Sequence, residues 1–208
     1  MSKENSGRNS PIFTDALINR MKTSPYDTMN GFPRKLVSDT WLEEFKKTGK
    51  GWLRILSGSM APLIETGNQI FIEKISPSKI HIGDIITFWK GNILVTHRVI
   101  RKVRKGRNLY FIERGDRYLR HSLIASRSLM GKVRQIKKGT KNYNIDSLIW
   151  QLFNRAVGIT FFCVFATRII SRKIPFFPKF LKNFVKNIYK IFGLASDKML
   201  GVVMLLKK

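Results

Sequence analysis

Short apolar runs separated by turn-forming residues dominate the middle of the chain. The runs are rich in Ile, Val and Phe and cover residues 52–56, 69–74, 84–89, 92–100, 109–113 and 129–136. Turn signals lie between them, as in Lys90-Gly91-Asn92 and Lys105-Gly106-Arg107. Short strands punctuated in this way predict an antiparallel β domain over residues 51–137.

A short helix is predicted just before this β region, over residues 38–48. Ser38 or Thr40 can cap it, and Glu43 follows Thr40 at the capping-box spacing. Gly49 then supplies the stop signal that commonly ends a helix.

The pattern becomes helical again after residue 146. Residues 147–167 carry one charge, Arg155, and the uncharged run 156–167 is much shorter than the about 20 residues of a spanning helix. An Arg within a span costs roughly 2.5–3.5 kcal/mol on insertion scales. This segment therefore favours a buried or interfacial helix over a single-pass anchor.

Residues 179–192 predict an amphipathic helix. Its apolar positions share one helical face, and the opposite face holds only Lys and Asn, with no acid. Such a helix suits the plane of an anionic membrane surface, and the alternative is packing against its own domain. The apolar positions are Phe180, Leu181, Phe184, Val185, Ile188, Ile191 and Phe192.

Together these elements predict an α+β fold. Residues 1–36 form a disordered or irregular start, in which no secretory signal peptide is visible. Residues 37–140 form the mainly antiparallel β domain with its preceding short helix. Residues 141–208 form a helical, basic, membrane-associating extension.

Charge and composition narrow the function classes. The 208 residues are 43% hydrophobic, which is enough for a core, and the net charge is +26. Residues 101–145 hold 14 basic and 2 acidic residues, and residues 172–208 hold nine and one. Such an excess predicts attraction to nucleic acid or to an anionic lipid surface. The sequence gives no sign of a cofactor or metal. The single cysteine, Cys163, excludes a disulfide framework and a Cys-rich zinc site, and the familiar nucleotide-binding loops are absent. No cofactor or metal is therefore expected.

Three residues carry candidate chemistry. Ser59 lies in a Ser-Gly-Ser-Met-Ala-Pro turn after a predicted strand, His97 lies among strand valines, and Asp116 follows a later strand. Taken singly, each has a common structural role. Together they offer a nucleophile, a base with a pKa near neutrality and an orienting carboxylate.

These motifs resemble those of type I signal peptidases, in the endoplasmic-reticulum-type branch whose base is histidine. The sequences SGSMAP, GDIITF, LVTHRV and ERGD occur in the family's order, across residues 51–137. The resemblance implies the signal-peptidase fold, which is shared with self-cleaving repressor domains. It also implies cleavage of a precursor protein or peptide, after a small residue.

The resemblance also implies roles for individual residues. Ser59 would be the nucleophile, His97 the general base, and Asp116 the acid that orients His97. The Ser59 backbone N–H and the Ser57 hydroxyl would form the oxyanion hole. Met60 would line the substrate pocket.

Two positions depart from the family pattern. Ala61 replaces a residue that is usually Glu or another polar side chain, and His121 stands where a second acid often follows Asp116. One alternative is therefore a non-catalytic, membrane-associated adaptor on the same fold. Another is a nucleic-acid-binding protein using the basic 101–145 block, although that block carries no recognisable nucleic-acid-binding signature. The expected location is the cytoplasmic membrane, through peripheral contact at 179–192 or a single pass at 147–167.

Overall fold

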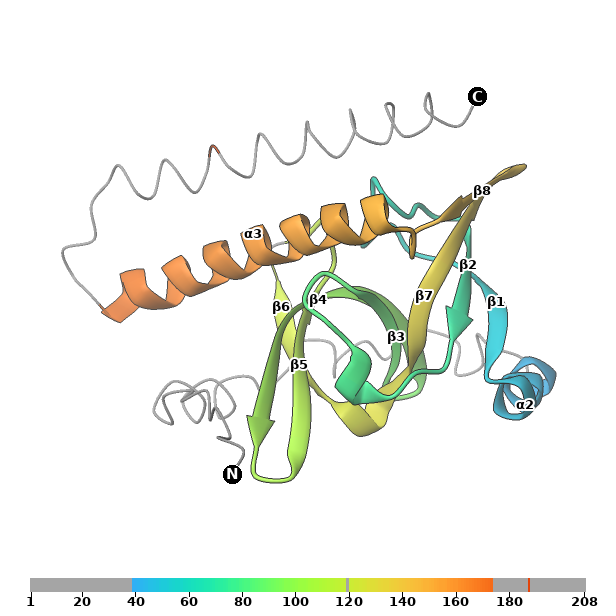
Figure 1. Ribbon diagram of the computed structural model, residues 1–208, viewed down its shortest axis with the longest axis horizontal. Helices are drawn as coiled ribbons and strands as arrows, with labels where there is room; N and C mark the ends of the chain where they lie inside the picture. The colour runs from blue at the N-terminus through green and yellow to red at the C-terminus, as the bar shows by residue number, and fades with distance from the viewer. Residues whose placement is uncertain (1–38, 119, 174–186, 188–208) are drawn as a thin grey trace, which may run out of the picture.

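The computed structural model of the protein describes residues 39–118, 120–173 and 187. The expected irregular start 1–36 and the expected amphipathic helix 179–192, apart from Asn187, lie outside the described residues. Figure 1 shows a strongly curled sheet with one long helix lying across it and a short helix beside one edge.

One sheet of eight strands forms the body of the molecule. Neighbouring strands pair antiparallel in the order β1-β2-β7-β3-β4-β5-β6, and β8 pairs with β7 outside this path. The strands are β1 (Lys50–Arg54), β2 (Gln69–Glu73), β3 (Ile85–Lys90), β4 (Ile93–Lys105), β5 (Asn108–Arg114), β6 (His121–Ala125), β7 (Leu129–Lys138) and β8 (Lys141–Asn144). Short 3-10 turns, η2 (Pro77–Lys79) and η3 (Ser126–Ser128), connect some of them.

Six of these strands follow the apolar runs of the sequence, and β6 and β8 were not predicted. β8 is a Lys-Asn-Tyr-Asn segment in which only Tyr143 is buried. Tyr143 pairs with Ile136 of β7, so tertiary pairing rather than local pattern makes this segment a strand.

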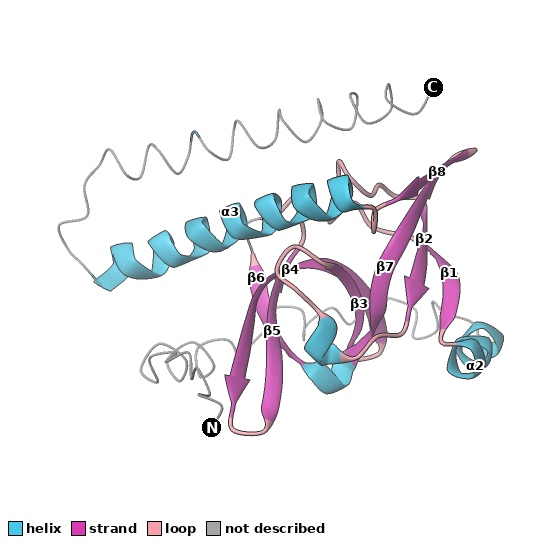
Figure 2. Ribbon diagram, viewed as in Figure 1, coloured by secondary structure: helices cyan, strands magenta, loops and turns pink. Residues whose placement is uncertain are grey.

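Two helices complete the described structure (Figure 2). α2 (Asp39–Thr48) matches the expected short helix and buries Phe45, against which the Trp41 ring stacks at 5.2 Å between centroids. α3 (Leu148–Lys173) contains the segment 147–167 almost entirely. The α+β fold class, mainly antiparallel β with a short helix before it, is thereby confirmed.

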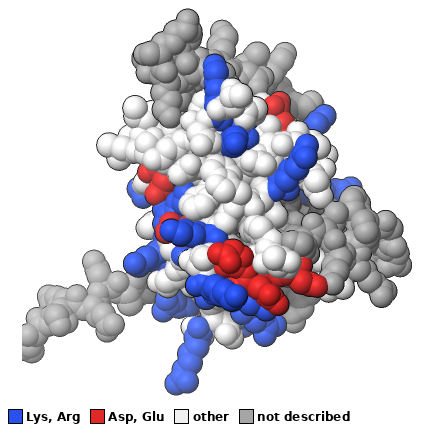
Figure 3. Space-filling view, turned by 90° about the vertical axis from the view of Figure 1, so that its right-hand side faces the viewer, with Lys and Arg blue, Asp and Glu red and all other residues white. Residues whose placement is uncertain are grey.

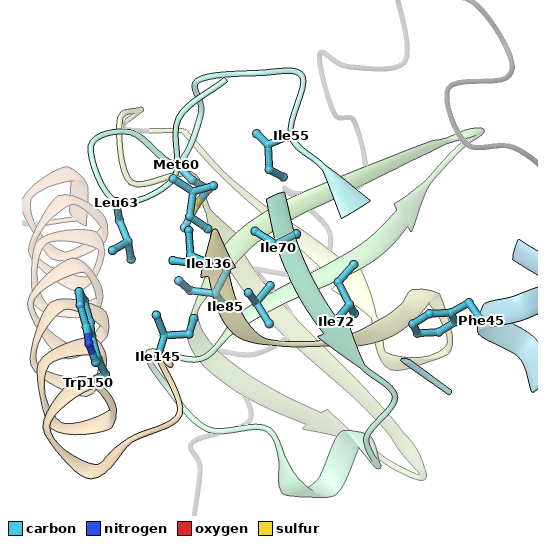
Figure 4. Packing of buried hydrophobic residues seen from close by; sticks show 12 residues of the cluster. Phe45, Ile55, Met60, Leu63, Ile70, Ile72, Ile85, Ile136, Ile145 and Trp150 are labelled. Carbon is cyan, nitrogen blue, oxygen red and sulfur yellow. The ribbon is translucent and has the colours of Figure 1, made fainter. Parts of the chain in front are cut away.

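The core joins α3 to the sheet. In one cluster, Met60, Leu63 and Trp150 lie together, so the loop after β1 and the start of α3 share the same interior (Figure 4). In a second cluster, α3 residues Val157 and Phe161 pack on strand residues of β4 and β5, among others. The described part of the expected extension 141–208 therefore packs on the β domain.

Charged side chains are mixed on the face that carries α2. Figure 3 shows acidic side chains gathered low on this face, at the height of α2, with basic side chains scattered around a broad uncharged area. Several basic residues of the 101–145 block have internal partners. Lys132 pairs with Asp84 at 2.9 Å, and Arg134 Nε pairs with Glu73 at 2.7 Å.

Candidate active site

Ser59 and His97 meet, although 38 residues separate them. Ser59 lies in the turn after β1 and His97 lies in the middle of β4. The Ser59 hydroxyl Oγ is 3.2 Å from His97 Nε2, within hydrogen-bond reach of a base. Ser59 is half-buried and His97 is buried, so the pair sits at the edge of the core rather than on open surface.

The carboxylate that contacts His97 belongs to Glu113. Its Oε2 lies at hydrogen-bond distance from His97 Nδ1, on the opposite side of the ring from Ser59. An acceptor at Nδ1 favours the tautomer that carries its proton there, which leaves Nε2 free to take the serine proton. We call Ser59, His97 and Glu113 the triad.

Asp116 lies elsewhere, which corrects the sequence-based expectation for that residue. Both of its carboxylate oxygens accept hydrogen bonds from Arg98, from Nε at 2.8 Å and from Nη2 at 2.7 Å. Arg98 is 1% exposed, so its charge requires a partner inside the fold. Asp116 therefore neutralises Arg98 instead of orienting His97.

The register of the sheet explains why Glu113 reaches His97. Alternation places His97 and Val99 on one face of β4, and Val99 lies opposite Glu113 of β5. Glu113 consequently projects from the same face as His97. The sequence shows Glu113 at the end of a strand, but only the pairing of β5 with β4 places it beside His97. The Gly-Asp motif, by contrast, points to Asp116 from residue order alone.

Glu113 is also supported from the neighbouring strand β6. Its partner on β6 is Ser122, directly after His121. The Ser122 hydroxyl donates to Glu113 Oε1, and Lys90 Nζ donates to Ser122 at 3.1 Å. The acid thus comes from β5, and a serine from β6 supports it.

The surroundings of Glu113 favour its ionised form. Burial raises the pKa of the carboxyl, but the charge on His97 lowers it. Hydrogen bonds from His97 and Ser122 and the charge on Lys90 act in the same direction. These effects outweigh burial, and the pKa of Glu113 lies below its ordinary value.

Gly115 allows the triad to assemble. A Cβ at this position would lie 2.6 Å from the Ser59 carbonyl oxygen and 3.1 Å from His97 Nε2. The same turn is tied to the serine loop, because the Arg117 backbone N–H donates to the Ser59 carbonyl at 3.0 Å. A glycine is therefore required where the two chain segments touch.

The remaining predicted site residues have different surroundings. Ser57 is exposed, and its Oγ is 3.5 Å from Ser59 Oγ, so the two hydroxyls lie at the limit of hydrogen-bond distance. Met60 is 2% exposed and packs in the core cluster with Leu63, so its part in a substrate pocket stays a prediction. Among the described residues, no group of three or more potential metal ligands comes together.

Asp84, which begins the apolar run 84–89, has structural contacts. Its Oδ2 accepts from the His81 backbone N–H at 2.8 Å, and its Oδ1 pairs with Lys132. These contacts hold the turn that leads into β3.

Comparison with known proteins agrees with the motifs. No family model matches the chain. The chain is 41% identical to signal peptidase I W of Bacillus subtilis (strain 168) over 64 residues, which is 30% of this chain and 34% of that protein. Over this part of its length, the chain is therefore related to the type I signal peptidases.

Proposed function

We propose that this protein is a serine endopeptidase of signal-peptidase type that uses Ser59, His97 and Glu113. The observation that carries the proposal is His97, which has a serine hydroxyl at one ring nitrogen and a carboxylate at the other. The partial relationship to a signal peptidase I supports the same class of reaction.

In this mechanism, Ser59 Oγ attacks the carbonyl carbon of the peptide bond while His97 Nε2 takes its proton. The tetrahedral oxyanion is stabilised by the Ser59 backbone N–H and the Ser57 hydroxyl. His97 then protonates the leaving amine, and an acyl-enzyme forms on Ser59. A water molecule deprotonated by His97 hydrolyses the ester and regenerates the hydroxyl.

Glu113 supports each of these proton transfers from behind the ring. Its carboxylate holds the Nδ1 proton and stabilises the imidazolium that forms during attack. A pKa below the ordinary value keeps Glu113 ionised at neutral pH. The substrate is a precursor protein or peptide with a small residue before the cut, met at the cytoplasmic membrane.

The nucleic-acid alternative receives less support. Basic residues of the 101–145 block are partly engaged inside the fold, since Arg114 lies over the Phe161 ring at 3.8 Å and Lys132 pairs with Asp84. The other alternative is a non-catalytic adaptor on the same fold. A measurement of peptide cleavage distinguishes it from the peptidase.

The test uses the purified full chain and a peptide library with small residues at varied positions, with products identified by mass spectrometry. Ser59→Ala and His97→Ala should each lower kcat/KM by about a thousandfold or more. Cleavage that persists at the unaltered rate in both variants would refute the proposal. Absence of cleavage by the unaltered chain on every peptide would favour the adaptor.

A further inference from the structure

Helix α3 has an inner and an outer apolar face. The inner face is buried on the sheet through residues such as Trp150, Val157 and Phe161. The opposite side, which we call the outer face, also carries large apolar side chains in the open. They are Leu148, 72% exposed, Ile149, 62%, Leu152, 59%, and Ile159, 52%. A row of exposed apolar side chains along one helix marks an interaction surface.

The inner face holds α3 against the sheet through polar as well as apolar contacts. The Asn154 side-chain oxygen accepts from Arg98 Nη1 at 2.7 Å, and both residues are buried. Gly158 lies so close to Gly83 that a Cβ on Gly158 would be 2.6 Å from the Gly83 backbone. The helix and the Gly83 turn are thus packed backbone against backbone.

These contacts argue against α3 crossing a membrane. By length and composition, residues 148–167 could span one, and 39% of that window is buried inside the protein. Spanning would remove the inner face from the sheet, deprive Arg98 of Asn154 and place both Asn154 and Arg155 among acyl chains. Each of these changes is unfavourable, whereas contact through the outer face alone leaves the fold intact.

The charges of α3 indicate the nature of the partner. Among the helix side chains that the structure describes, none is acidic, and the exposed Arg155 lies on the outer face, three residues after Leu152 and four before Ile159. A further cation, Arg101, lies 5.3 Å from the Phe162 ring of α3. An apolar surface accompanied only by positive charge complements an anionic lipid headgroup layer.

We propose that α3 lies in the plane of an anionic lipid surface, with its outer face at the boundary between headgroups and acyl chains. This docking requires no catalysis, so it stands independently of the proposed peptidase activity. It also accounts for an apolar helix that stays packed on the sheet and still exposes Ile149 and Leu152.

The single cysteine offers a direct probe of this surface. Cys163 is exposed on α3, four residues after Ile159 and therefore on the same side of the helix. We would attach an NBD fluorophore to Cys163 in the full-length Ser59→Ala chain, so that binding is measured without cleavage. Vesicles of phosphatidylcholine with phosphatidylglycerol, carrying quenchers at known depths, then report the position of the label.

The proposal predicts a blue shift of NBD emission with anionic vesicles and strongest quenching at shallow depth, about 5–10 Å into the boundary. The emission of a label at Asn108→Cys in a Cys163→Ser background, at the exposed start of β5, should not change. Strongest quenching at the bilayer centre would overturn the proposal in favour of a span. If the chain sediments with vesicles but the NBD emission stays unchanged, the proposal is also overturned. The outer face would then be covered by residues 174–208 or by a second copy of the chain, and not by lipid.

A matched pair of variants tests the outer face itself. Leu152→Glu with Ile159→Glu should weaken vesicle binding at least about tenfold, because each exchange removes an apolar side chain from the contact. The control, Gln69→Glu with Asn108→Glu, changes the net charge equally at exposed positions of the sheet and should bind nearly as the parent does. Equal binding by both double variants would contradict the proposal. A cleavage measurement separates this test from that of the peptidase. In the chain that retains Ser59, Leu152→Glu with Ile159→Glu should leave the rate of peptide cleavage in solution unchanged.

Discussion

The Glu113 carboxylate lies at Nδ1 of His97, while Asp116, three residues further along the chain, lies on Arg98. Two acids close in sequence therefore serve different partners. One completes the proposed catalytic arrangement, and the other compensates a buried guanidinium. This division separates the expected effects of altering them.

Glu113→Gln should abolish most activity while retaining a folded protein. The amide can no longer stabilise the imidazolium, and loss of the equivalent acid in other serine enzymes lowers kcat by about 10⁴. Steady-state kinetics with the unaltered chain as reference measures the loss in kcat.

Asp116→Asn should instead lower the free energy of unfolding by about 3–5 kcal/mol, as when a buried ion pair is broken, with a smaller effect on kcat. A folded Asp116→Asn protein without activity, beside an active Glu113→Gln protein, would reverse the assignment.

The stability of the fold should fall in acid partly through Glu113. Its pKa in the folded protein is below the value of about 4.3 expected in the unfolded chain, so its contribution is fully present above that value. The contribution is lost as the pH falls through the folded-state pKa. Denaturant titrations at several pH values should therefore show the difference between the parent and Glu113→Gln shrinking towards acid. Glu43→Gln, an exposed change on α2, is the control, and a Glu113→Gln difference that is constant from pH 7 to pH 3 would contradict the prediction.

Gly115→Ala should disable the triad, because the new Cβ meets the Ser59 carbonyl oxygen at 2.6 Å and backbone must shift. A displacement of about 1 Å at a reacting group can cost 10²-fold in rate. Gly58→Ala provides a neighbouring comparison, since its Cβ would meet only Arg117 Nη1, at 3.5 Å, and Thr66. The two values of kcat/KM should differ by at least about tenfold, and equal values would show that close packing at Gly115 is unimportant.

Asn154→Ala should loosen α3 from the sheet. Arg98 would lose a buried acceptor, which lowers the free energy of unfolding by about 1–3 kcal/mol. The adjacent Arg155→Ala change is exposed and should cost less than about 0.5 kcal/mol. Urea denaturation measures both, and an effect of Asn154→Ala no larger than that of Arg155→Ala would argue that α3 is not anchored by this bond.

The sequence predicted the fold where local pattern determines it. Alternating Ile, Val and Phe located six strands, and a capping residue followed by glycine located α2. β8 was missed because it is a short polar segment in which only Tyr143 is buried, so its pairing with β7 leaves no apolar run in the sequence. The candidate site was found through Ser59 and His97, whose types and order carry the chemistry. The acid was assigned to Asp116 because its motif is conspicuous, whereas the role of Glu113 depends on the register of β5 against β4, which residue spacing does not specify.

The most direct test of the central claim, proteolysis by Ser59, is a comparison of protein N-termini in cells. Cells expressing the unaltered chain or Ser59→Ala would be analysed by mass spectrometry for the N-termini of all membrane and secreted proteins. The account predicts a set of N-termini that requires Ser59, each following a small residue in its precursor. Identical N-termini in both cell lines, with both chains present in equal amounts, would contradict it.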